Sequence, residues 1–143
     1  MATVGPITDE QITHVHSHMW ERGRDELRRM GYDPGKMLPT FLERNRTPFS
    51  FGVFVDGKPV AFMGASKKSE NLYSTWFQAT DEFNGKATLA VRRFLKATMA
   101  DHPGTELVLH TASVHPDADR WFACLGFRPL TYGSGIRSFR YEG

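Results

Sequence analysis

A short polar segment, residues 81–88, could bind a phosphate or pyrophosphate through its backbone. It follows residues 73–80, whose aromatic and β-branched side chains predict a buried strand. From Gly85 onward apolar residues recur at helical spacing, so a helix should begin there. The free N–H groups and the dipole of a helix N-terminus attract anions, and the small residues Gly85 and Ala87 would let an anion approach. An ordinary helix start packed on a sheet is the alternative interpretation of the same residues.

Two histidines, His14 and His18, would share one face of a helix at a spacing that can bind a metal. No cysteine or carboxylate at ligand spacing supports them, and Glu21 is only a loosely placed third ligand. We therefore expect a solvated helix face and no metal site.

The same helix should also carry a basic strip that is offset by acidic residues. A solvated, salt-bridged surface is the expected role of this strip, and a docking surface for an acidic partner is the alternative. The residues concerned are Arg22, Arg24, Arg28 and Arg29 with Glu21, Asp25 and Glu26.

The composition indicates one globular domain that spans residues 1–143. Eighteen basic residues against 16 acidic ones give a formal charge of +2, which is too balanced to predict a nucleic-acid partner. Cys124 is the only cysteine, so no intrachain disulfide can form, which fits a reducing compartment. No apolar run reaches membrane-spanning length and the first residues lack a signal region, so we expect a cytoplasmic protein.

Turn and helix signals predict the elements that would position these groups. Thr8 and Gln11 form a capping box at a helix start. The apolar spacing beyond them predicts one helix that continues past Gly23 and ends at Gly31. A short second helix should cover residues 39–44.

The rest of the chain predicts strands that alternate with helices. Asp56-Gly57 should form a tight turn between two strands. The expected strands are 1–6, 49–55, 58–66, 72–80, 106–113, 127–130 and 136–141, the last two forming a hairpin around 132–135, and the expected helices begin at 85 and 118. This order indicates an α/β or α+β fold in which helices cover a sheet.

The chain resembles the GNAT acyltransferase superfamily in three features. These are the order of elements, the small-residue turn at residues 85–87 and the helix that ends in Leu125-Gly126-Phe127. The resemblance implies a mixed, mainly antiparallel sheet of about six to seven strands flanked by helices. It also implies that acetyl-CoA binds where two neighbouring strands splay apart and that its acetyl group passes to an amine. The acceptor amine could belong to a protein or to a small molecule.

The phosphate-binding pattern of the superfamily is Arg or Gln, two residues, Gly, one residue, then Gly or Ala. Gly85 and Ala87 match this pattern, whereas Glu82 places a carboxylate where a cation or an amide is usual. The resemblance therefore implies that backbone amides from Asn84 to Thr88 hold the pyrophosphate.

A later superfamily pattern begins with Asn and passes through Ala and Tyr to Gly-Phe. In this chain His115 occupies the Asn position of the pattern, and Phe122 occupies the Tyr position. The Tyr often reprotonates the leaving CoA thiolate, which Phe122 cannot do. The full set of cofactor-binding residues that the resemblance implies is Gln78, Ala79, Thr80, Asn84, Gly85, Lys86, Ala87, Thr88, His115 and Phe122.

Acyl transfer needs a base for the amine and a hydrogen-bond donor for the thioester carbonyl. The donor should be a backbone N–H within residues 78–80, near Ala79. The candidate catalytic side chains are His110 and Glu70 as bases and Tyr73 as an acid, with Asp81, Glu82 and Tyr132 as further candidates.

A closer resemblance is to the internal virion protein A–like proteins of short-tailed phages, which are themselves similar to GNAT proteins. It covers most of the chain after Phe49 and rests on residues 57–61, 76–77, 85–87 and 120–122. It implies a phage protein in the host cytoplasm, with a host protein target or a place in the virion. A GNAT-like module without catalysis is thus the alternative to an acetyltransferase, and CoA binding separates the two hypotheses.

Overall fold

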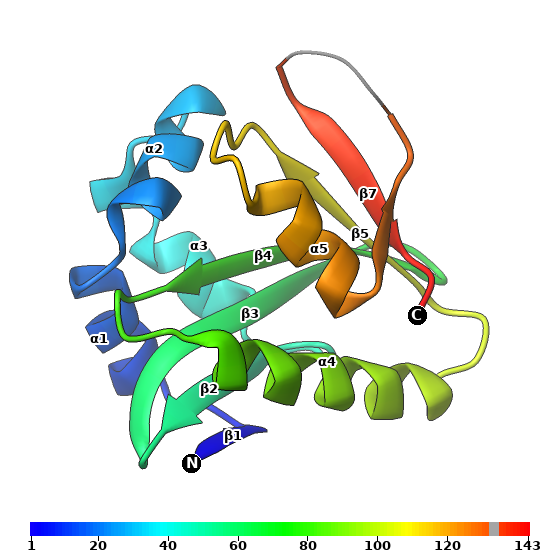
Figure 1. Ribbon diagram of the computed structural model, residues 1–143, viewed down its shortest axis with the longest axis horizontal. Coiled ribbons are helices and arrows are strands. Elements are labelled where there is room, and N and C mark those ends of the chain that lie inside the picture. The colour runs from blue at the N-terminus through cyan, green and yellow to red at the C-terminus, as the bar shows by residue number, and fades with distance from the viewer. Residues whose placement is uncertain (132–134) are drawn as a thin grey trace.

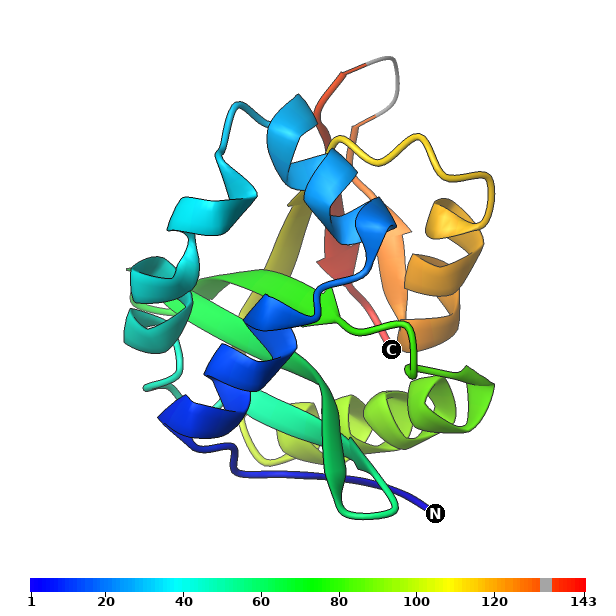
Figure 2. The ribbon, with the colours of Figure 1, turned by 90° about the vertical axis from the view of Figure 1, so that its left-hand side faces the viewer.

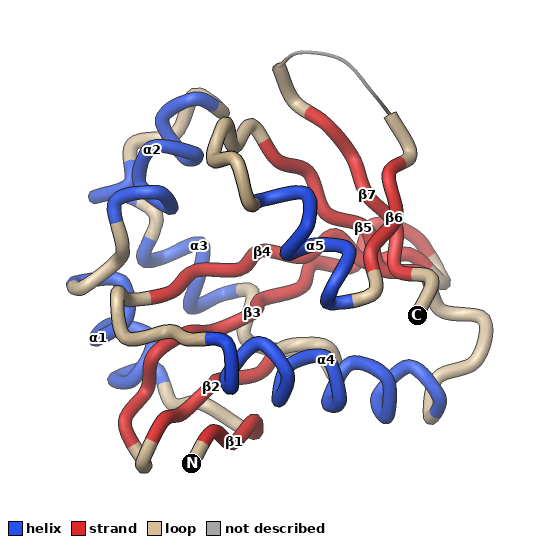
Figure 3. Tube along the Cα trace, viewed as in Figure 1, coloured by secondary structure: helices blue, strands red, loops and turns tan. Residues whose placement is uncertain are grey.

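The computed structural model describes residues 1–131 and 135–143 and shows one sheet with helices on both faces (Figures 1 and 3). The elements are β1 (Ala2–Gly5), α1 (Asp9–Ser17), α2 (Glu21–Arg29), the 3₁₀ turn η1 (Pro34–Lys36), α3 (Leu38–Glu43), β2 (Phe51–Val55), β3 (Lys58–Ser69), β4 (Leu72–Ala79), α4 (Gly85–Ala100), β5 (Glu106–Thr111), α5 (Ala118–Leu125), β6 (Phe127–Pro129) and β7 (Arg137–Tyr141). The predicted mixed fold with a mainly antiparallel sheet is confirmed. None of the described helices is long and apolar enough to cross a membrane.

The sheet opens between its two parallel strands. The strands pair in the order β1-β2-β3-β4-β5-β7-β6, and only β4 and β5 run parallel. Their register runs from Leu72↔Glu106 to Thr75↔Leu109 and stops there, although both strands continue. Beyond that point β4 and β5 diverge (Figure 1). A parallel pair needs a crossover, and α4 supplies it.

Helices lie on both faces of the sheet (Figure 2), and each face has its own hydrophobic core. Leu95 of α4 and Phe122 of α5 belong to the core on one face. Ile12 of α1 and Phe41 of α3 pack with Phe62 of β3 on the other face, where α2 also lies. Helices on both faces therefore border the opening between β4 and β5.

The single helix predicted from Thr8 to Gly31 is wrong, because the chain forms α1 and α2 with a break between them. At the break the N–H of Trp20 donates to Ala79 O at 2.9 Å, and Met19 forms a β-bridge with Thr80. In a continuous helix the N–H of Trp20 would donate to a carbonyl one turn earlier, but here it is bonded to the end of β4. As a result α2 turns over the end of β4.

Three of the predicted turns and caps are confirmed, whereas the predicted hairpin turn around 132–135 lies largely outside the described residues. Thr8 and Gln11 form both bonds of the capping box at the start of α1. Asp56 and Gly57 have φ of +51° and +80°, as a tight hairpin turn requires. Gly126 ends α5 in the left-handed region with φ of +107°.

Replacing Thr8 with alanine should lower the free energy of unfolding by about 1 kcal/mol, because the N–H of Gln11 loses the Thr8 hydroxyl that it donates to. Urea denaturation measures this change. Thr13→Ala is the matched control on the same helix, since the Thr13 hydroxyl bonds the Asp9 carbonyl inside the helix. We expect that variant to be neutral or slightly stabilised, because alanine is the better helix former.

Candidate active site

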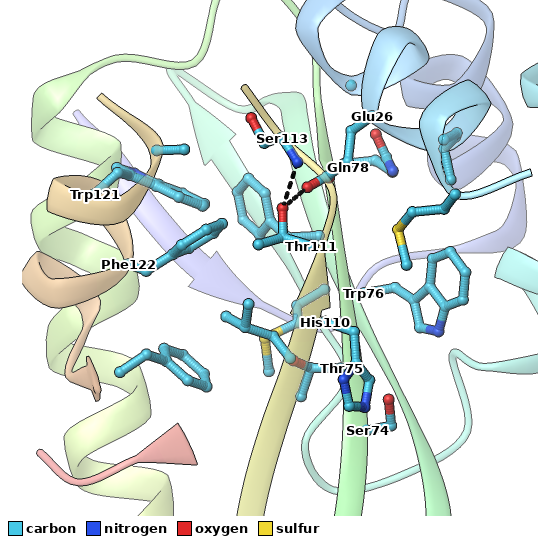
Figure 4. Close-up of a pocket in the computed structure, with 18 of the residues that line it drawn as sticks. Glu26, Ser74, Thr75, Trp76, Gln78, His110, Thr111, Ser113, Trp121 and Phe122 are labelled. Atoms are coloured by element: carbon cyan, nitrogen blue, oxygen red, sulfur yellow. Dashed lines mark hydrogen bonds between the residues drawn. The ribbon is translucent and has the colours of Figure 1, made fainter. Parts of the chain in front are cut away.

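A cavity of about 380 Å³ lies where β4 and β5 separate (Figure 4). Its walls come from the helices of both faces, including α2 and α5, so the cavity crosses the sheet. The lining residues are Trp20, Arg22, Gly23, Glu26, Leu27, Met30, Tyr32, Arg44, Met63, Lys68, Ser74, Thr75, Trp76, Phe77, Gln78, Val91, Leu109, His110, Thr111, Ser113, Ala118, Trp121, Phe122, Leu125, Phe127 and Ile136.

The backbone of β4 turns hydrogen-bonding groups toward this opening. The N–H of Thr80 donates to Val60 O of β3, and alternate residues of a strand bond to neighbours on opposite sides. Gln78 therefore pairs with β3 as Thr80 does, whereas the N–H groups of Phe77 and Ala79 face the side where pairing with β5 has ended. Of residues 78–80, which were expected to hold the thioester donor, only Ala79 has its N–H on the side of the opening. The N–H of Phe77, outside that range, also faces the opening.

Glu26 of α2 lines the cavity and is half-buried (Figure 4). Its carboxylate accepts a bond from the Thr111 hydroxyl, whose oxygen accepts the N–H of Ser113 at 3.1 Å. Burial raises the pKa of the Glu26 carboxyl and outweighs the opposing effects of the Thr111 bond and of the positive charges of Arg22 and Arg137. A carboxylate with a raised pKa in a cavity is suited to take a proton from an amine.

Glu26 faces the cavity rather than the solvated surface that was expected from its sequence neighbours. Gly23 and Glu26 of α2 and Met30 at its C-cap recur at spacings of three and four, and all line the cavity. An acidic residue within that helical stripe was the available signal. The outer part of the strip is salt-bridged as predicted, because Arg28 pairs with Glu21 and Arg29 with Asp25.

Gln78 places an amide beside Gly23, three residues before Glu26 on α2. Its side chain is 2% exposed, and Oε1 has no hydrogen-bond partner among the described residues. That oxygen lies close to Gly23, where an added Cβ would come within 2.6 Å of it. A buried acceptor without a partner costs about 1–3 kcal/mol, so a ligand N–H would be favourable here.

The turn between β4 and α4 is a capped helix start. The side-chain Oδ1 of Asn84 accepts a hydrogen bond from the N–H of Ala87, and the backbone carbonyl of Asn84 accepts one from the N–H of Thr88, both at 3.0 Å. The expectation that all amides from Asn84 to Thr88 are available is therefore wrong for two of them. The N–H groups of Gly85 and Lys86 have no partner among the described residues, and the space beside Gly85 is open.

Glu82 does not leave an unpaired carboxylate at this turn. Its Oε1 lies 2.6 Å from Lys58 Nζ, at the end of the β2–β3 hairpin. The negative charge that departs from the superfamily pattern is thus balanced by a nearby cation.

An aromatic cluster formed by Phe77, Phe83 and Trp121 lies between this turn and α5. The ring centroids are 4.8 Å apart for Phe77–Trp121 and 5.3 Å apart for Phe77–Phe83. Trp121 also donates from Nε1 to the Thr88 hydroxyl at 3.1 Å. This cluster ties α5 to the start of α4.

The predicted catalytic side chains do not gather in one place. His110 lines the cavity, with Nδ1 2.8 Å from Ser138 Oγ. Glu70 lies in the exposed turn after β3, 3.8 Å from Lys67, and Tyr73 packs against Phe49. Neither Glu70 nor Tyr73 lines the cavity. Tyr132 lies outside the described residues.

The two later residues of the predicted cofactor set also separate. Phe122 lines the cavity and packs against Phe139 in a tilted arrangement, with ring centroids 5.0 Å apart. His115 lies before α5, where its Nδ1 accepts the N–H of Asp117 at 3.2 Å. Among the described residues no group of His, Cys, Asp and Glu could hold a metal ion.

No family model and no curated protein sequence matches this chain, but solved structures do. The PaiA N-acetyltransferase of Thermoplasma acidophilum, in complex with coenzyme A, has a TM-score of 0.69 at 13% identity over 100% of this chain and 99% of that chain. The GNAT domain of S. lividans PAT has a TM-score of 0.71 at 13% identity over 96% and 88%. The chain has the GNAT fold. An aminoglycoside acetyltransferase, AAC(6')-Ib in complex with coenzyme A, is also similar, with a TM-score of 0.62 at 13% identity over 98% and 93%.

In this GNAT fold the cavity lies at the splay between two neighbouring strands, where the sequence resemblance placed it. At 13% identity the likeness establishes the fold. The resemblance to the phage family gains no support from these comparisons.

Proposed function

We propose that this protein is an N-acetyltransferase that uses acetyl-CoA and acts on an amine. The observation that carries the proposal is a single cavity that brings together a free backbone edge at Phe77 and the carboxylate of Glu26. The similar structures solved with coenzyme A support a thioester as the ligand of this opening. A phage origin and a host target stay predictions from the sequence resemblance.

The residues of the cavity divide the chemistry between them. Acetyl-CoA supplies an activated acetyl group. Glu26 takes a proton from the amine, whose nitrogen bonds to the acetyl carbon while the carbon–sulfur bond breaks and CoA leaves as its thiolate. The N–H of Phe77 donates to the carbonyl oxygen as negative charge develops there.

The turn at the start of α4 suits the pyrophosphate of CoA. Gly85 and Lys86 offer two N–H groups without partners among the described residues, and no atom would crowd a Cβ at Gly85. The Lys86 side chain is exposed and adds a positive charge nearby. These groups would hold the phosphates, while the divergence of β4 and β5 would admit the pantetheine arm.

Calorimetric titration with acetyl-CoA tests this proposal. We expect micromolar binding in the wild type and at least a roughly tenfold loss in Gly85→Glu, because a carboxylate would then face the pyrophosphate. Ala100→Glu adds the same charge at the far end of α4 and should bind like the wild type. No binding at millimolar acetyl-CoA would contradict the proposal.

The second candidate function is a GNAT-like binding module without catalysis. The cluster of Phe77, Phe83 and Trp121 favours it, because these rings fill space between the α4 start and α5. Phe122 offers no proton for a leaving thiolate, which favours it too. Absence of CoA binding together with a stable fold would select this function.

A further inference from the structure

The cavity wall on the α2 side carries more positive than negative charge. Arg22, Arg44 and Lys68 line it, and Glu26 is the only acidic side chain among the described lining residues. An acceptor with several positive charges and no negative one would be repelled by this wall. The charge balance therefore favours an amine that also carries an anionic group.

Arg44 is the clearest candidate partner for that anion. Its guanidinium is half-buried and lies over the Trp76 ring, with Cζ 4.6 Å from the ring centroid. None of the ion pairs among the described residues involves Arg44. A partly buried cation without a partner is costly, and an anionic ligand would remove that cost.

The side chains of β4 set the distance between the base and this cation. Ser74, Trp76 and Gln78 alternate onto one face of the strand, which is the face that carries Arg44 and α2. Gln78 lies beside Gly23 of α2, and Trp76 lies under Arg44. Two residues of strand span roughly 7 Å. The amine and the anion of one ligand should therefore be separated by a chain of several atoms.

The wall between these two ends is apolar. Trp76 contacts Tyr32, with ring centroids 5.4 Å apart, and Met30 lines the same cavity. Methylene groups of a ligand would bury their surface here. Lys68 lines the cavity from β3 and adds a second, exposed cation.

We propose that the acceptor is a small alkylamine whose far end carries an anionic group. The amine lies at Glu26 and Gln78, the methylene chain lies along Trp76, and the anionic group pairs with Arg44 and Lys68. This inference rests on the proposed acetyltransferase function and names the substrate class of that site.

A matched series of three amines tests the proposal. 6-Aminohexanoate, hexylamine and 1,6-diaminohexane have the same primary amine and chain, but their far ends are anionic, neutral and cationic. With acetyl-CoA saturating and CoA thiol release as the readout, kcat/KM for 6-aminohexanoate should exceed that for hexylamine by about 10- to 100-fold. 1,6-Diaminohexane should be the poorest acceptor. A diamine that equals or exceeds 6-aminohexanoate would overturn the proposal.

Variants locate the anion site. Arg44→Gln should remove most of the advantage of 6-aminohexanoate over hexylamine, measured as the ratio of the two kcat/KM values in the same variant. Lys68→Gln, at an exposed position, should give a smaller loss of the same kind and serves if Arg44→Gln does not fold. Lys67→Gln is the control, because Lys67 does not line the cavity. An unchanged advantage in both test variants would contradict the proposal.

A binding measurement distinguishes failure of this inference from failure of the proposed function. All three tryptophans of the chain line the cavity, so their fluorescence reports ligands without any turnover. If no amine is acetylated, the acetyltransferase proposal fails. The order of the three affinities still decides the charge preference, with 6-aminohexanoate tightest as the expected result and equal affinities as the contradicting one.

Discussion

Replacing Glu26 with glutamine should lower kcat/KM for amine acetylation by roughly 10²- to 10⁴-fold, the usual contribution of a general base. Glutamine has nearly the same shape and can still accept the Thr111 bond, so the cavity should keep its form. Acetyl-CoA affinity should not change, because Glu26 is on α2 and the turn at Gly85 is elsewhere on the cleft. Steady-state kinetics and calorimetry on the same samples measure both quantities.

Glu21→Gln is the matched control for this prediction. Glu21 is on the same helix, but it is exposed and pairs with Arg28. We expect its kinetics to equal those of the wild type. If Glu26→Gln keeps activity within about threefold, the base is elsewhere, and His110 would be the next side chain to replace because it also lines the cavity.

The Glu26→Gln variant should have a higher free energy of unfolding than the wild type at neutral pH. Burial raises the pKa of Glu26 in the folded protein above its unfolded value, so ionisation above that pKa opposes folding. Glutamine never ionises and avoids this cost. Thermal unfolding should therefore show a higher Tm for Glu26→Gln at pH 7–8, and the gain should disappear below about pH 4, where the carboxyl is protonated in both states.

Replacing Phe62 with alanine should lower the free energy of unfolding by about 3–5 kcal/mol, as expected for a buried aromatic side chain. Phe62 is 1% exposed and packs edge-to-face on Phe41, with ring centroids 5.1 Å apart. It belongs to the core that holds α1 and α3 on the sheet. Urea denaturation followed by far-UV circular dichroism measures the loss.

Phe62→Leu tests whether the loss comes from the cavity. Leucine keeps most of the volume, so that variant should lose no more than about 1.5 kcal/mol. Equal losses in the two variants would point to the aromatic contact with Phe41 instead. The substitution Phe94→Ala removes from the opposite core a less deeply buried ring, which packs against Phe51, and should cost less free energy of unfolding.

The local elements of the fold could be predicted because neighbouring residues carry their signals. The capping box at Thr8, the turn at Asp56-Gly57 and the helix end at Gly126 each depend on the backbone preferences of a few adjacent residues. The order of these elements was enough to indicate a GNAT-like sheet with a splay.

The site could be predicted only in part, because its groups come from distant segments. The β4–α4 turn was located, but the cap formed by Asn84 occupies two of its amides. Glu26 lay within a run of charges whose outer members are solvated, so its direction depended on how α2 packs.

The sequence by itself determined the order of the strands and most of the helices, together with the caps and tight turns that bound several of them, because hydrogen bonds between near neighbours and hydrophobic spacing act within a single element. Only the tertiary structure decided the break at Trp20, since that residue bonds to Ala79 at the far end of β4. That bond turns α2 over the gap between β4 and β5 and brings Glu26 to the cavity. The candidate chemistry thus depends on contacts between residues far apart in the chain, which no local pattern encodes.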